Sequence, residues 1–145
     1  MSLHFSEIFD YKGANVMHVA RAGNLTTAGG ILPANGVAVI NVLCWVYLDN
    51  AADCVLNVAT ADDAAGTNTT ALTENVPIWI QGVKQTAAKA VTFLSTLTAD
   101  TYHSACIQVP ANLVPADKYL ITYLTAGNAN NLVTAIAVNE DYYKG

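Results

Sequence analysis

A run of twelve residues, Val37–Leu48 (VAVINVLCWVYL), limits the possible folds of this chain more than any other segment. Its β-branched and aromatic residues favour an extended strand, and both of its alternating faces are apolar. One face carries Leu43, Trp45 and Tyr47, and the other carries residues such as Ile40. A strand with one wet face would alternate apolar and polar residues. We therefore expect the core to cover one face, and another layer, most simply a neighbouring subunit, to cover the other.

Further strand-like segments, separated by turn residues, predict an all-β fold. Amphipathic helical patterns are absent, and this combination is typical of an antiparallel β-sandwich or barrel. We expect a jelly-roll-like sandwich, because seven or eight strands fit that topology best, although the sequence leaves the strand order open. Because Asp49 and Asn50 form a turn signal after Val37–Leu48, we also expect a hairpin with Cys54–Ala61. The other expected strands are 76–81, 90–97, 102–109, 118–125 and 132–139, with a possible eighth at 16–21.

The length of 145 residues predicts one domain, spanning residues 1–145. An N-terminal arm at 1–15 and a C-terminal tail at 140–145 fall outside the strand pattern. Both segments are polar but hold aromatic residues, namely Phe5, Phe9, Tyr142 and Tyr143. These rings are candidates for docking, either on their own domain or on a neighbour.

Charge and hydropathy exclude several functional classes. Charged residues make up only 12% of the chain, and the net charge is −5. An acidic chain without clustered Lys and Arg repels phosphate, which argues against nucleic-acid binding. The longest apolar run, Val37–Leu48, is interrupted by Asn41 and is too short to cross a bilayer. The N-terminus has no basic region followed by an apolar one, so we expect synthesis and folding in a cytoplasm.

The sequence offers no catalytic or metal-binding constellation. The three histidines are scattered, and Cys44, Cys54 and Cys106 lack the close spacing of zinc ligands. We expect these cysteines to be small buried side chains. Asp62 and Asp63 are followed by Ala and Gly rather than by alternating oxygen ligands, which indicates a solvated turn instead of a calcium loop. We therefore expect a non-enzymatic protein without a cofactor.

The two tryptophans leave one alternative open. Trp45 and Trp79 lie among apolar neighbours, and this favours packing in the core or at an interface. A β-sandwich that displays aromatic rings on a flat face can instead stack on sugars. A glycan- or receptor-binding module is therefore the alternative to a packing role.

Two stretches resemble segments of small structural proteins from tailed-phage virions. Residues 58–72 (VATADDAAGTNTTAL) are similar to a strand that ends in an "ATDAAGTGAKAL"-like loop in that family. Residues 107–145 follow the family's order of strand, loop, strand, polar turn, strand and short tail. Asn68 and Thr69 stand where the family favours Gly and Ala, and the tail at 142–145 (YYKG) lacks the family's Arg and final Pro.

This resemblance implies a phage or prophage virion protein, made in a bacterial cytoplasm and associated with the capsid as a head decoration or cement protein. Such proteins are commonly small β-sandwiches, often jelly rolls, that sit as trimers on the shell. The expected partners are further copies of this chain, with a trimer favoured, and the major capsid protein or other virion proteins. The candidate core or interface residues are Leu43, Trp45, Tyr47, Trp79, Phe5, Phe9, Tyr142 and Tyr143.

Overall fold

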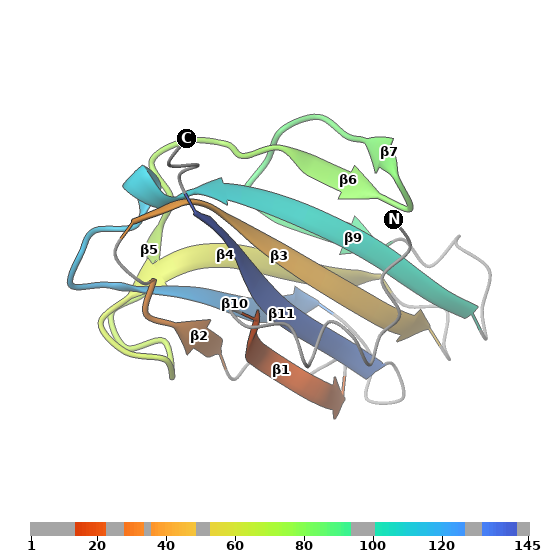
Figure 1. The fold of residues 1–145 in the computed structure, drawn as a ribbon. Coiled ribbons are helices and arrows are strands. Elements are labelled where there is room, and N and C mark those ends of the chain that lie inside the picture. The colour runs from red at the N-terminus through yellow and green to blue at the C-terminus, as the bar shows by residue number, and fades with distance from the viewer. Residues whose placement is uncertain are drawn as a thin grey trace.

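A computed structural model describes residues 14–22, 28–33, 36–48, 53–93, 101–126 and 132–141. The described residues form two packed antiparallel sheets, which confirms the predicted all-β sandwich (Figure 1). The elements are β1 (Ala14–Ala22), β2 (Gly29–Ile31), β3 (Val37–Leu48), β4 (Cys54–Ala61), β5 (Thr70–Ala71), β6 (Ile78–Ile80), β7 (Val83–Lys84), β8 (Ala90–Phe93), β9 (Thr101–Pro110), a 3₁₀ turn η1 (Ala111–Leu113), β10 (Tyr119–Ala126) and β11 (Leu132–Asp141).

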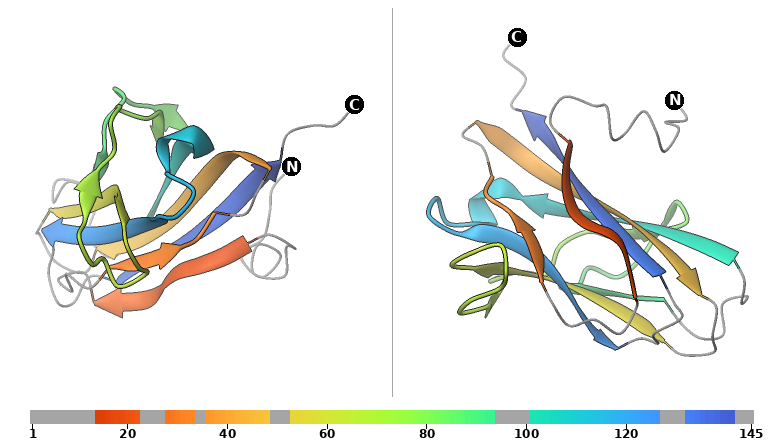
Figure 2. Two further views of the ribbon diagram at one scale, coloured as in Figure 1. Left: turned by 90° about the vertical axis from the view of Figure 1, so that its left-hand side faces the viewer. Right: turned by 90° about the horizontal axis from the view of Figure 1, so that it is seen from below.

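The order of the strands is that of a jelly roll. One sheet has the order β1-β11-β3-β9-β6-β7, and the other has the order β2-β10-β4-β5, with β8 also paired to β4. When β5, β6 and β7 are set aside as an insertion, eight strands remain. Their ranks are one, eight, three and six in the first sheet, and two, seven, four and five in the second. This interleaving of two Greek keys confirms the predicted jelly-roll topology, and Figure 2 shows the sheets as two layers.

The expected hairpin between Val37–Leu48 and Cys54–Ala61 is wrong. β3 pairs with β11 on one side and with β9 on the other, whereas β4 lies in the opposite sheet. Both neighbours of β3 offer ten-residue ladders, which match its length better than the eight-residue β4 does. The long ladders of β3 with β9 and β11 therefore outweigh the turn signal at Asp49 and Asn50. The chain crosses from one sheet to the other after β3.

One apolar cluster fills the space between the sheets. The inward side chains of β3 (Ile40, Val42, Cys44 and Val46) are fully buried. The hydroxyl of Thr122 is also fully buried, and it donates to the carbonyl of Gly29 at 3.5 Å. The cluster is completed by residues of β9 and β11 beside β3 and of β4 and β10 in the opposite sheet, namely Ile107, Val109, Val133, Ala135, Leu56, Val58, Leu120 and Leu124.

The loop at 62–69 is a turn closed by its own side chains, as the sequence predicts. Asp63 Oδ1 accepts from the backbone amides of Ala65 and Thr67, each at 3.0 Å, and Thr67 Oγ1 donates to Asp63 Oδ2 at 2.6 Å. Asp62 pairs with Lys118 and accepts a hydrogen bond from the side chain of Asn68. The carboxylate of Asp63 is thus bonded within the loop, and that of Asp62 is bonded by Asn68 and Lys118.

These contacts predict a pH-dependent contribution of Asp63 to stability. The Thr67 hydroxyl, followed by the Thr67 backbone amide, lowers the pKa of Asp63 in the folded state. A lowered carboxyl pKa stabilises the fold above the unfolded-state pKa of about 3.9, and this contribution disappears as the pH falls through the folded-state value. We expect Asp63→Asn to lower the free energy of unfolding at neutral pH, with the difference from wild type shrinking below pH about 4.

Urea unfolding at a series of pH values measures this difference. Glu74→Gln, at an exposed carboxylate outside the 62–69 loop, is the matched control and should not reproduce the effect. A difference between wild type and Asp63→Asn that stays constant down to pH about 2 would contradict the role assigned to this carboxylate.

Candidate binding site

The outward side of β3 is only half covered within this chain. Leu43, Trp45 and Tyr47 are half-buried on the outer face of the six-stranded sheet, and none belongs to a core cluster. The expected burial of one face of this strand is therefore confirmed, while the other face remains partly accessible. The interface role of these three side chains stays a prediction.

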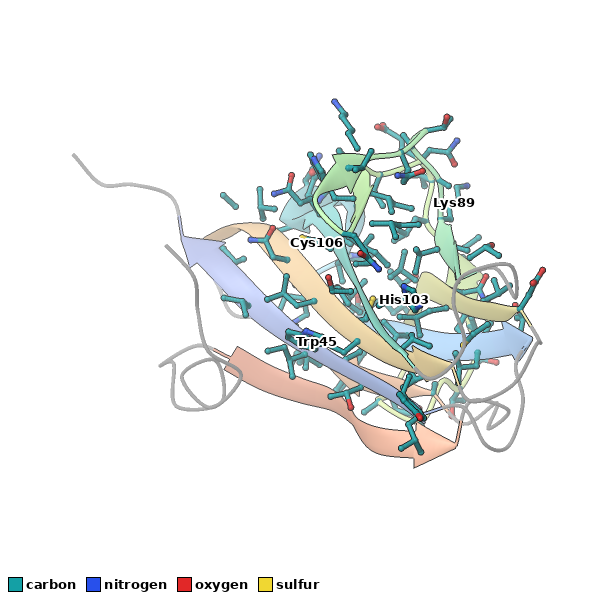
Figure 3. All side chains as sticks on the ribbon, turned by 90° about the vertical axis from the view of Figure 1, so that its right-hand side faces the viewer. Trp45, Lys89, His103 and Cys106 are labelled. Carbon is teal, nitrogen blue, oxygen red and sulfur yellow. The ribbon has the colours of Figure 1, made fainter. Side chains whose placement is uncertain are left out.

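A trough lies over β9, between the two tryptophans. Trp45 on β3 is paired in register with Ser104, and Trp79 on β6 is paired with Cys106. Since β9 runs between β3 and β6, the small side chains of Ser104 and Cys106 form a floor with an indole on each side. Two strand spacings separate the indole-bearing strands, a distance of about 10 Å. Figure 3 shows Trp45 and Cys106 on these neighbouring strands.

The trough has a volume of about 410 Å³. Its lining also includes Leu43 on the β3 side, Gln108 on β9, and Gln81 and Gly82 in the turn after β6. A volume of this size falls in the range of small-molecule sites, about 300–1,000 Å³. The structure therefore brings together three of the candidate residues, Leu43, Trp45 and Trp79.

The turn between β6 and β7 fixes one end of the trough. Gln81 has a positive φ of 49°, and Gly82 has a φ of 78°. The backbone amide of Gln81 donates to the carbonyl of Ser104 at 2.9 Å, and its side-chain amide lies 2.5 Å from Nδ1 of His103. These bonds hold the β6–β7 hairpin against β9, and the hairpin extends the sheet beyond β9 in Figure 1.

The three thiols differ in accessibility. Cys44 and Cys54 are buried, and burial raises the pKa of both thiols, that of Cys54 to about 11. Cys106 is half-buried in the floor of the trough. Because the thiolate is the reactive form, buried thiols with raised pKa values react slowly.

We therefore predict that iodoacetamide modifies one thiol of the folded protein at neutral pH. Mass spectrometry of the digested protein should locate the label at Cys106, and unfolding in urea should release the other two thiols. Labelling of Cys44 or Cys54 at the rate of Cys106 in the folded protein would contradict the burial of these side chains.

The described part of the chain contains no group of His, Cys, Asp and Glu that could hold a metal ion. Among the described residues that line the trough, none is Asp, Glu, His, Lys or Arg. No helix within the described ranges has the length and apolarity needed to cross a membrane.

The terminal candidates are not placed by the structure. Phe5, Phe9, Tyr142 and Tyr143 all lie outside the described residues. The expected boundaries overlap the sheet, because β1 already begins at Ala14 and β11 continues to Asp141. The docking of the arms thus stays a prediction.

Sequence reasoning did not identify the floor and the rim of the trough. Ser104, Gln81 and Gln108 carry no motif, and they become neighbours of the tryptophans only through the strand order. The alternation of 102–109, which places Ser104, Cys106 and Gln108 on one face, was the only available signal.

Comparisons with models of protein families, with curated proteins and with solved structures gave no match.

Proposed function

We propose that this protein is a non-enzymatic virion structural protein of a phage or prophage, a head decoration or cement protein that acts by self-association and by packing on the capsid. The observation that carries this proposal is the half-exposed outward side of the long central strand β3. The resemblance of residues 58–72 and 107–145 to small phage proteins supports the virion context, and jelly rolls are frequent in viral capsids.

The surface best suited to self-association covers β3 and β11. We call it the β3–β11 patch, and it consists of Leu43, Tyr47, Leu132, Thr134 and Val138, whereas Ile136, opposite Leu43 on the same outward row, is fully buried within the chain. Leu132 lies opposite Tyr47 in the ladder and is 42% exposed, although it is a large apolar side chain. Apolar residues gathered on one exposed face favour contact with another protein surface. The low proportion of charged residues, 12%, further lowers the cost of covering such a face.

Purification of the phage particles encoded beside this gene tests the virion role. We expect mass spectrometry of the particles to detect the 15.3-kDa chain at a fixed ratio to the major capsid protein. Portal, protease or major capsid genes beside this gene would identify the phage whose particles are purified. Particles that lack this chain, although it is present in the lysate, would contradict the proposal.

A second candidate function is a glycan- or receptor-binding module. The trough favours it, because two indoles, from β3 and β6, flank a floor of small side chains. The trough adjoins the β3–β11 patch and shares Leu43 with it, so the two functions use overlapping parts of one sheet.

A further inference from the structure

Both tryptophans of this chain line the same trough, although they come from different strands. Two strand spacings, about 10 Å, separate the strands that carry them. The floor between them consists of Ser104 and Cys106, which are among the smaller side chains, and the two tryptophans line the trough from the strands on either side. An aromatic wall on each side of a low floor fits a flat ring better than a bulky branched group.

The lining of the trough is neutral among the described residues. Its polar groups are the hydroxyl of Ser104, the amide of Gln108 and the amide of Gln81, whose nitrogen already contacts Nδ1 of His103. An amide both donates and accepts hydrogen bonds, and a hydroxyl does the same. A ligand that matches this lining carries no net charge, has one or two apolar faces, and presents hydroxyl or amide groups at its edge.

A neutral pyranose residue has these properties. Its C–H face is apolar and packs on an indole, and its equatorial hydroxyls project outward toward hydrogen-bonding side chains. We propose that the trough binds a neutral saccharide, with one sugar ring lying over Ser104 and Cys106 between Trp45 and Trp79. This inference rests on the second candidate function and does not depend on the self-association proposed above.

Lys84 acts as a positioning residue for one wall. Its Nζ lies over the ring of Trp79, 5.8 Å from the centroid. Lys84 on β7 and Cys106 on β9 are both paired with Trp79, so they flank this indole from opposite sides. The cation therefore supports Trp79 from the side away from the trough, and the side toward β9 is left for the ligand.

Intrinsic fluorescence provides a site-specific test, because the chain has no tryptophan outside the trough. The full-length protein is titrated with neutral oligosaccharides of gluco, galacto, manno and N-acetylglucosamino configuration. We expect at least one to change the emission in a saturable way, with a dissociation constant between about 10 μM and 1 mM. Sialyllactose and glucuronic acid, which are anionic, should bind more weakly than this sugar.

A matched pair of variants locates the site. Ser104 and Thr92 are both small hydroxyl residues on strands, one in the floor of the trough and the other exposed on β8 in the opposite sheet. We expect Ser104→Phe to weaken saccharide binding by about tenfold or more, and Thr92→Phe to change it by less than about twofold. Trp79→Ala should also lose binding, while Trp79→Phe should recover part of it. Iodoacetamide labelling of Cys106 should slow in the presence of the bound sugar.

Three outcomes would overturn this inference. The first is that no neutral saccharide changes the emission up to about 10 mM, ten times the dissociation constant of a weak millimolar site. The second is equal binding by Ser104→Phe and wild type. The third is an emission that changes with protein concentration alone and not with sugar, which would show that a second copy covers the trough. Light scattering on the same samples tests self-association independently of sugar binding. If the protein assembles but binds no sugar, the saccharide inference is wrong and the proposed self-association stands.

Discussion

Replacing Leu120 with alanine is expected to lower the free energy of unfolding by about 2–5 kcal/mol. Leu120 is fully buried in the core cluster, and its strand β10 is paired on both sides, by β2 and β4. The substitution removes apolar contacts and leaves a cavity between two sheets that cannot fully collapse. Because a domain of this size is stable by only about 5–15 kcal/mol, the loss should shift the urea midpoint strongly at an unchanged slope.

The matched control for this variant is Leu32→Ala, the same chemical change at a leucine that is 52% exposed. We expect this variant to stay within about 0.5 kcal/mol of wild type. Equal losses for the two variants would contradict the placement of Leu120 between the sheets.

The second large effect concerns assembly. Leu132→Arg is expected to weaken self-association by about 2 kcal/mol or more, roughly 30-fold in the dissociation constant. Leu132 is exposed at one end of the β3–β11 patch and lies opposite Tyr47, so an arginine there would bring an unpaired charge into the expected apolar interface. Sedimentation velocity over a range of protein concentrations measures the change.

Leu32→Arg is the control for this charge, because Leu32 is also an exposed leucine but follows β2 in the opposite sheet. It should leave the distribution of oligomers unchanged. If Leu32→Arg dissociates the assembly and Leu132→Arg does not, then the contact lies on another surface and the β3–β11 patch is excluded.

Local sequence patterns were sufficient to predict much of the fold. The alternation within 102–109 correctly separates inward from outward residues: Ala105, Ile107 and Val109 lie in the core, whereas Ser104 does not. The period of a strand is two, so burial on one face is visible in any single segment. The number of such segments then indicated a jelly roll.

The partner of each strand was not predictable in this way. Turn chemistry at Asp49 and Asn50 favours a hairpin, but the pairing of β3 depends on the long ladders that β9 and β11 form much later in the chain. The same limit applies to the trough. Trp79 reaches its position beside Cys106 because the β6–β7 hairpin joins the far edge of β9, and this contact leaves no periodic signal in the sequence.

The absolute mass of the wild-type protein in solution tests most directly whether this sheet face is built for contact with further copies. Multi-angle light scattering should be recorded at a protein concentration of tens of micromolar, because dissociation constants of weak self-association lie between about 1 μM and 1 mM. The account predicts a discrete multiple of 15.3 kDa, with a trimer favoured, and a lower mass for Leu132→Arg. A folded wild-type protein that scatters as a single 15.3-kDa chain at this concentration would contradict it.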